Sequence, residues 1–223
     1  MRLITALFAA TLFALGSLSA EGAVQVGFKG GLNWSNQNVE VEDLDVDDIQ
    51  RSTGFHLGPT IDLNIRSLAV ELGTLLSNKG GKFTFKGIEG MGDVKDRTID
   101  RDLWYVDIPL TFKLNYSLGP LDFYGGLGPY VGIGLTGETL TMDFDEDGEM
   151  VEDGEHTEDI DWGEHLKRDE YGLELAAGGA VGSFRLGATY RMGLSGIEVD
   201  NGTDLAPDKI DNRVLGAYVG FWF

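Results

Sequence analysis

The sequence predicts an all-β protein: a closed eight-stranded antiparallel transmembrane β-barrel with short periplasmic turns and long extracellular loops. Three observations predict this fold class. Eight segments have an apolar residue at every second position, which is the pattern of a β-strand with one apolar face. After the N-terminal segment, no apolar run approaches the length of a membrane helix, so a chain that enters lipid must do so as a closed barrel. The connections between the segments alternate between short and long.

The first element is a secretory signal peptide, predicted over residues 1–20. Arg2 precedes an apolar run over 3–15, and small residues follow over 16–20. We expect cleavage between about residues 19 and 23 and a single outer-membrane barrel domain over 21–223. The chain contains no cysteine, which excludes disulfides and thiol chemistry.

The eight alternating segments are the predicted membrane strands. Most of them have roughly ten residues or more, enough for a tilted strand to cross a bilayer. Trp104 and Tyr116 bracket the fourth segment as interfacial aromatic girdles would, and the terminal Phe223 resembles the sorting signal of bacterial outer-membrane barrels. The apolar rows occupy 24–34, 55–65, 68–76, 104–116, 121–135, 171–181, 184–194 and 215–223.

The connections define two rims. Short turns are predicted at 66–67, 117–120 and 182–183. Long loops are predicted at 34–53, 77–103, 136–170 and 195–212. An even number of strands places both termini on the short-turn rim, which is periplasmic in outer-membrane barrels.

Charge is distributed unevenly between loops and strands. The net charge of −20 argues against a nucleic-acid partner, and the 136–170 loop alone has fifteen acids against two bases. The strands and turns have equal numbers of both signs, mostly on the row opposite the apolar one. Since an eight-stranded barrel is barely wide enough for side chains, these charges predict a filled, charge-paired lumen. They are Glu21, Asp62, Glu71, Asp107, Asp122 and Glu174 with Lys29, Arg66, Lys113, Arg185, Arg191 and Arg213.

A soluble barrel with its apolar row inward is the alternative interpretation of the alternation. Small residues on the polar row favour the membrane interpretation, because they suit a crowded polar interior and would leave a soluble core poorly packed. These are Gly27, Gly31, Gly58, Gly73, Gly126, Gly128, Gly178, Gly187, Gly216 and Gly220.

Short motifs carry a resemblance to a known family. Segment 105–114 has the form Tyr-x-acid-Ile-Pro-Leu-x-x-Lys, segment 123–132 contains Gly-Pro-Tyr, and segment 27–33 reads Gly-Phe-Lys-Gly-Gly-Leu-Asn. Together they resemble the PorT-like outer-membrane barrels of the Bacteroidetes group, which are eight-stranded barrels of the OmpX/OmpA type. The resemblance implies a Gram-negative outer-membrane barrel and no particular activity. We expect Pro109 and Pro129 at a bulge or near a rim, since proline cannot donate to a sheet ladder.

Few residues suggest a chemical site. Segment 143–148 opens like a calcium loop, but Gly154 stands where a bidentate glutamate is required. We expect His56 to belong to an interior hydrogen-bond network, and the spacing of His156 and His165 matches no metal motif. We therefore expect no catalytic, cofactor-binding or metal-binding residues.

The predicted role is structural, or one of interaction through acidic surface loops. Two alternatives are a narrow porin and a surface enzyme for lipid A modification or proteolysis, for which His165 and Ser195 would share a rim. The expected partners are outer-membrane lipid and lipopolysaccharide, divalent cations loosely bound at the acidic loops and an unidentified protein. The chain is expected to be a monomer without enzymatic activity.

Overall fold

The computed structural model describes residues 24–40, 46–85, 96–145, 147–163, 166–195 and 209–223. The predicted signal peptide and its cleavage site lie outside these ranges. Within them, no helix has the length and apolarity needed to cross a membrane.

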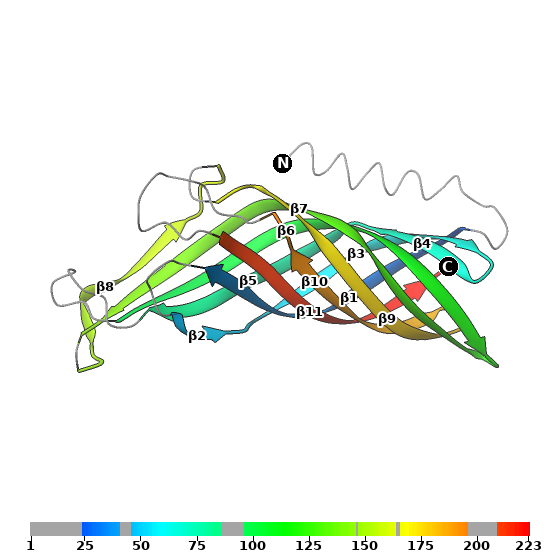
Figure 1. The fold of residues 1–223 in the computed structure, drawn as a ribbon, viewed down its shortest axis with the longest axis horizontal. Helices are drawn as coiled ribbons and strands as arrows, with labels where there is room; N and C mark the ends of the chain where they lie inside the picture. Colours follow the sequence, from blue (N-terminus) through cyan, green and yellow to red (C-terminus); the bar gives the residue numbers. More distant parts are fainter. Residues whose placement is uncertain (1–23, 41–45, 86–95, 146, 164–165, 196–208) are drawn as a thin grey trace.

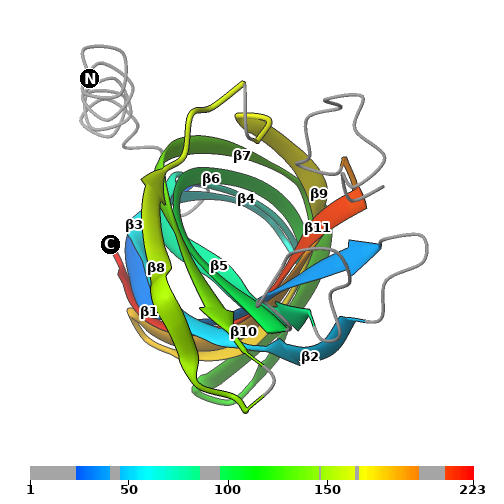
Figure 2. The same cartoon turned by 90° about the vertical axis from the view of Figure 1, so that its left-hand side faces the viewer.

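Eight antiparallel strands form a closed ring, which confirms the predicted fold class (Figures 1 and 2). Around the ring the order is β1, β3, the pair β4 and β5, β6, β7, β9, β10 and β11, and β11 pairs with β1. Each predicted segment coincides with one strand of this ring. The strands are β1 (Val24–Glu40), β2 (Val46–Gln50), β3 (Ser52–Ile65), β4 (Leu68–Gly73), β5 (Leu75–Phe85), β6 (Asp96–Leu118), β7 (Leu121–Phe144), β8 (Met150–Asp159), β9 (Asp169–Val181), β10 (Phe184–Gly193) and β11 (Lys209–Trp222).

Prolines explain why one ring strand is divided into β4 and β5. Thr74 separates the two pieces, and its N–H donates to the carbonyl of Pro59 at 3.0 Å. Pro59 has no N–H to return the bond. On the other side the ring of Pro109 lies against Gly73, with its Cγ 3.1 Å from the position of an added Cβ. The ladder is therefore interrupted on both sides of Thr74.

The expectation that Pro109 and Pro129 mark a bulge or a rim is wrong. Both lie inside their strands. The pairing of β6 with β7 lapses between Pro109 and Phe112 and then resumes in the same register. The register shift between these strands falls instead at Trp104 and Tyr105. The prolines, which have no N–H group, therefore interrupt the hydrogen bonds between β6 and β7, but neither strand gains the extra residue of a bulge.

The short turns are confirmed. Strand pairing reaches Ile65–Leu68, Leu118–Leu121 and Val181–Phe184, so each of these hairpins closes through two residues. The first turn residue has positive φ in each: 58° at Arg66, 63° at Gly119 and 57° at Gly182. These turns lie at the same end of the barrel as the C-terminus (Figure 1).

The predicted long loops are partly wrong, because the strands continue into them. β6 has 23 residues and β7 has 24, whereas a membrane strand needs about 9–11. β2 and β8 arise wholly within predicted loops and pair with β5 and β7. Figure 1 shows β8 and the end of β7 beyond the barrel, at the end opposite the short turns. A β-sheet therefore projects from this rim.

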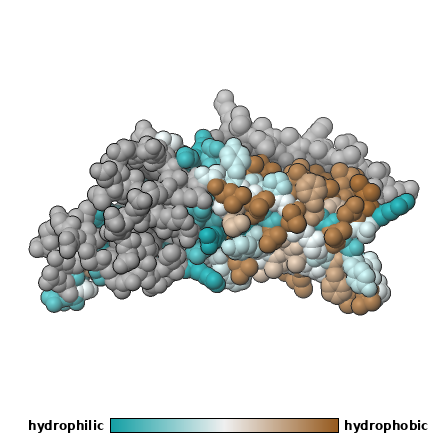
Figure 3. Space-filling view, in the orientation of Figure 1, coloured by the Kyte–Doolittle hydropathy of each residue, from teal (hydrophilic) through white to brown (hydrophobic). Residues whose placement is uncertain are grey.

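The two faces of the barrel wall are as predicted. Side chains of the apolar rows are exposed, among them Leu127 (61%), Leu186 (64%) and Val219 (62%). Side chains of the polar rows are buried, including Asn33 and Asp107. Figure 3 shows apolar side chains gathered on the part of the wall nearer the short turns. The barrel thus has an apolar exterior and a polar interior, the opposite of a soluble β-barrel.

Candidate functional site

Ten charged side chains of the interior form two clusters. The turn-side cluster consists of Lys29, Asp62, Glu71, Lys113 and Arg185, and the loop-side cluster of Lys79, Asp107, Glu170, Glu174 and Arg191. Apart from Arg185, every member is at most 3% exposed. Together the clusters hold five cations and five carboxylates, as a buried network requires if no charge is to be left without a counterion.

The turn-side cluster is a chain of shared carboxylates. Lys113 Nζ donates to Asp62 and to Glu71, both at 2.8 Å. Lys29 Nζ donates to the other oxygen of Glu71 at 2.7 Å, and Arg185 donates to Asp62. The five residues come from five different strands of the ring, so this series of ion pairs connects opposite parts of the barrel wall across the lumen.

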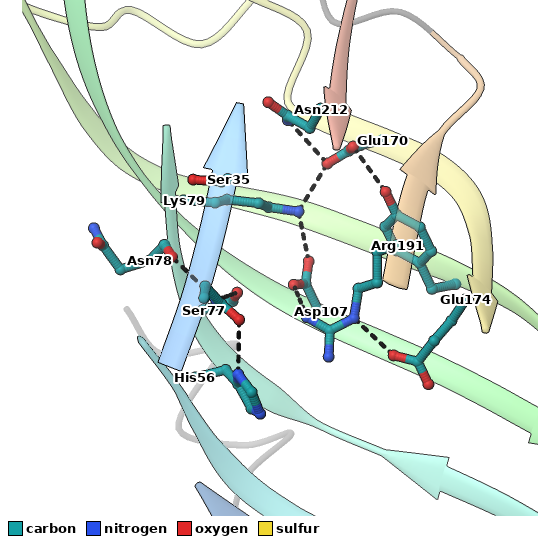
Figure 4. Close-up of polar contacts among 12 residues, drawn as sticks. Ser35, His56, Ser77, Asn78, Lys79, Asp107, Glu170, Glu174, Arg191 and Asn212 are labelled. Carbon is teal, nitrogen blue, oxygen red and sulfur yellow. Dashed lines mark hydrogen bonds and ion pairs between the residues drawn. The ribbon is translucent and has the colours of Figure 1, made fainter. Parts of the chain in front are cut away.

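The loop-side cluster has the same construction (Figure 4). Lys79 Nζ donates to Asp107 at 2.9 Å and to Glu170 at 2.8 Å. Arg191 donates from Nε to Glu174 at 2.7 Å and from Nη1 to Asp107 at 3.2 Å. Asp107 thus joins the two cations, and each cation has a second carboxylate of its own.

Aromatic rings fill the space around these charges. Lys79 Nζ lies 4.1 Å from the centre of the Tyr105 ring, and the Arg185 guanidinium lies 4.1 Å from that of Trp222. Tyr124 and Tyr218 share a hydrogen bond between their hydroxyls. The inward glycines make this crowding possible, since an added Cβ at Gly27 would meet the Trp222 ring at 2.5 Å.

Sequence reasoning found eight of the ten charges in the clusters and missed Lys79 and Glu170. Both lie in the predicted long loops, although each continues the inward row of a strand. Lys79 follows Ser77 at an interval of two, and Glu170 precedes Glu174 by four. Continued alternation past residues 76 and 171 is the signal that could have found them. Of the other four predicted charges, Asp122 and Arg66 are exposed near the short turns, Arg213 is half-buried on β11, and Glu21 lies outside the described residues.

His56 and Asn33 form a further polar group in the interior, and their hydrogen bonds confirm the prediction for His56. His56 Nδ1 lies 2.7 Å from Asn33 Oδ1. Asn33 Nδ2 donates to Ser77 Oγ at 3.0 Å and to two backbone carbonyls, those of Phe55 and Asn78. The histidine is therefore part of an interior hydrogen-bond network.

Trp162, which follows β8, packs at the loop-side end of the interior. The Trp162 ring stacks edge-on against Tyr105 with a centroid distance of 5.5 Å. It also occupies the space beside Gly134, where an added Cβ would lie 2.5 Å from the ring. Ile160 and Leu166, on either side of Trp162, are buried as well. Trp162 thus packs on Tyr105, the ring that flanks Lys79 of the loop-side cluster.

Acidic side chains line the projecting sheet. Glu155, Glu158 and Asp159 of β8 are exposed. Among the described strands, β8 pairs with β7 alone, so its other edge carries backbone donors and acceptors that pair with no strand of the described chain. The ends of β6 and β7 are joined by Arg97, whose Nε and Nη2 donate to Asp143 at 2.6 and 2.8 Å. These hydrogen bonds hold the pKa of Asp143 below its usual value.

The calcium-like segment is engaged within the protein. Asp143 binds Arg97, and Asp145 accepts hydrogen bonds from the backbone N–H groups of Asp147 and Glu149, each at 2.9 Å. Across the described part of the chain, no three acidic or histidine side chains form a group that could hold a metal ion. Loose binding of divalent cations at the acidic surface stays a prediction.

The residues considered for a surface enzyme are not brought together in the described structure. Ser195 Oγ accepts the N–H of Tyr171 at 2.9 Å and so fastens the end of β9. His156 is exposed on β8, opposite Thr141 of β7. His165 lies outside the described residues.

Several solved structures of outer-membrane proteins are similar to this chain. OprG of Pseudomonas aeruginosa is 16% identical with a TM-score of 0.48, and the alignment covers 90% of this chain and 96% of OprG. Ail of Yersinia pestis is 16% identical (TM-score 0.40; 90% and 99% covered), and the neisserial surface protein NspA is 12% identical (TM-score 0.41; 88% and 96% covered). A comparison with curated proteins gives no significant match.

The family described as "Outer membrane protein beta-barrel domain" matches residues 15–198, which is most of the chain. The match agrees with the closed ring and the apolar exterior. It places the protein in the bacterial outer membrane, so the short turns face the periplasm and the projecting sheet faces outward. The chain belongs to the outer membrane protein beta-barrel domain family.

Proposed function

We propose that this protein is a monomeric, non-conducting and non-enzymatic barrel that binds a cationic polypeptide at the cell surface. The observation that carries the proposal is the acidic sheet projecting from a barrel whose interior is occupied by ion pairs. The barrel would then act as a rigid membrane anchor, and the sheet would make the contact.

The interior supports an anchor better than the alternative of a narrow porin. Lys79, Asp107 and Arg191 lie across the lumen with at most 2% exposure. A permeating ion would have to separate these buried pairs, and breaking one such pair costs about 3–5 kcal/mol. The Trp162 ring packs edge-on against Tyr105 at the outward end of the same region.

The chemistry of β8 indicates the class of partner. A strand edge without a pairing strand can accept an extended peptide as an additional strand. Glu155, Glu158 and Asp159 are exposed there, so a peptide with basic side chains is favoured over an acidic one. The predicted divalent cations would be further ligands of the same carboxylates and could bridge them to the phosphates of lipopolysaccharide.

The test is a binding measurement on the mature protein in lipid nanodiscs. The probe is a synthetic decapeptide of alternating lysine and threonine. A decapeptide of alternating lysine and proline is the matched control, because it carries the same charge but lacks half of the ladder donors. We expect the threonine peptide to bind at least tenfold more tightly.

A variant protein separates the β8 edge from general attraction to an acidic surface. The triple substitution Glu155→Gln, Glu158→Gln and Asp159→Asn should weaken binding of the threonine peptide at least tenfold. Asp122→Asn, at the periplasmic rim, should leave binding unchanged. Equal binding of both peptides, or no effect of the triple substitution, would contradict the proposal.

We also propose that the chain belongs to the PorT-like subgroup of these barrels. The motif over 105–113 and the Gly128-Pro129-Tyr130 sequence support this assignment. Pro109 and Pro129 have a common structural consequence, the interrupted ladder between β6 and β7. A solved PorT-like barrel without this interruption would count against the assignment.

A further inference from the structure

Two buried polar atoms near the middle of the lumen have no hydrogen-bond partner among the described residues. They are Nε2 of His56 and Nη2 of Arg191. Each residue is 1% exposed, so bulk water does not reach either atom. Buried polar groups without partners are costly and rare in native proteins.

The hydrogen bonds of Asn33 determine which atom of His56 carries the proton. Two of the acceptors of Asn33 Nδ2 are the backbone carbonyls of Phe55 and Asn78, so the amide orientation is fixed. Asn33 Oδ1 must then be the acceptor toward His56, and Nδ1 of His56 must be the donor. In the neutral imidazole Nε2 therefore has a free lone pair and requires a donor.

Arg191 has the complementary requirement. Its Nε is bound to Glu174 and its Nη1 to Asp107. Nη2 has only N–H groups to offer and requires an acceptor. One missing donor and one missing acceptor thus lie in the same buried region.

The strand register brings the two side chains to the same part of the lumen. A Cβ added at Gly216 would lie 2.7 Å from Thr189 Oγ1 and 3.3 Å from His56 Cε1. The His56 ring therefore reaches across to β10 beside Thr189. Arg191 is the next inward residue of β10, and Figure 4 shows it together with His56 and Asp107.

We propose that a buried water molecule binds between His56 and Arg191, donating to Nε2 and accepting from Nη2. Water supplies both functions at once, whereas a halide ion could only accept and would leave Nε2 without a donor. A buried water usually makes about three hydrogen bonds, and the Thr189 side chain is a further polar neighbour in the same region. The water joins the Asn33–His56 network to the loop-side cluster and makes the polar interior continuous at this level. This inference does not depend on the proposed partner.

The test is a crystal structure of the mature protein, at a resolution that shows ordered water, from crystals grown with bromide in place of chloride. We expect one peak within hydrogen-bonding distance of both atoms and without bromide anomalous signal. An anomalous peak would identify an anion and overturn the proposal. Absence of density, or direct contact between His56 and Arg191, would overturn it as well.

A variant and a spectroscopic measurement supply independent tests. The peak should be lost in His56→Leu and retained in Ser195→Ala, and a peak that persists in His56→Leu would show that the imidazole does not hold it. Nitrogen NMR of the wild-type protein should find the His56 proton on Nδ1. A proton on Nε2 would overturn the proposal even if the variant failed to fold.

Discussion

Lys79 offers a quantitative test of the ion-paired interior. The substitution Lys79→Met removes a buried cation that bonds to Asp107 and Glu170 at 2.9 and 2.8 Å. The loop-side cluster changes from two cations and three carboxylates to one cation and three carboxylates. Removing one partner of a buried pair costs about 3–5 kcal/mol. We expect about 3 kcal/mol, because Asp107 keeps Arg191 and Glu170 keeps its bonds to Tyr130 and Asn212.

A second substitution should restore part of the lost stability. Lys79→Met combined with Glu170→Gln returns the cluster to its original net charge. We expect the double variant to regain about 1–2 kcal/mol relative to Lys79→Met, within the usual coupling range for residues in contact. Lys167→Met, at an exposed position, is the control and should change stability by at most about 0.5 kcal/mol.

The assay is urea unfolding of the mature protein in lipid vesicles, followed by tryptophan fluorescence. The reasoning is refuted if Lys79→Met is as stable as Lys167→Met. It is also refuted if Glu170→Gln destabilises the Lys79→Met background further, because the two residues would then not share a buried charge balance.

Three further predictions concern the wall, the mouth and the projecting sheet. Leu127→Arg places a charge on the lipid face near mid-height and should lower the free energy of unfolding by about 2–4 kcal/mol, whereas Tyr116→Arg at the rim should lower it by about 0–1 kcal/mol. Equal losses would contradict the assignment of the apolar row to the lipid face. Gly134→Ala should displace the Trp162 ring and shift its emission to the red in a background without the other tryptophans, whereas Gly125→Ala, which meets nothing within 4 Å, should not. Asp143→Asn should destabilise the protein by less than about 1 kcal/mol at pH 7, since the pair with Arg97 is partly exposed. The hydrogen bonds from Arg97 lower the pKa of Asp143 in the folded protein below its unfolded value near 3.9. The stabilisation by this pair is therefore present above about pH 4 and is lost as the pH falls through the folded pKa. A stability difference between Asp143→Asn and wild type that persisted at still lower pH would contradict this prediction.

The wall of the barrel could be predicted because its signals are local. Alternation at period two assigns Leu127 outward and Asp107 inward without knowledge of their neighbours. Two-residue turns at Arg66 and Gly182 fix the antiparallel order from the spacing alone. The membrane interpretation then follows from the apolar exterior.

The ends of the strands could not be predicted in the same way. Beyond the membrane, the apolar row is replaced by polar residues on both faces, so alternation no longer separates strand from loop. For this reason the alternation does not identify Lys79 and Glu170 as strand residues, and it does not predict the pairing of β8 with β7. The pairing of specific charges across the lumen depends on barrel tilt and stagger, which no local pattern encodes. The location of Trp162 over Tyr105 is equally non-local, since 57 residues separate them in sequence.

Single-channel recording in a planar lipid bilayer tests the central claim most directly. Insertion of the mature protein would first be verified by a boiling-dependent shift in gel mobility, the mark of a folded outer-membrane barrel. If the five cations and five carboxylates pair across the lumen, the inserted wild-type protein should give no unitary current steps. Reproducible steps of uniform size from the inserted wild-type barrel would contradict the account and identify an open pore.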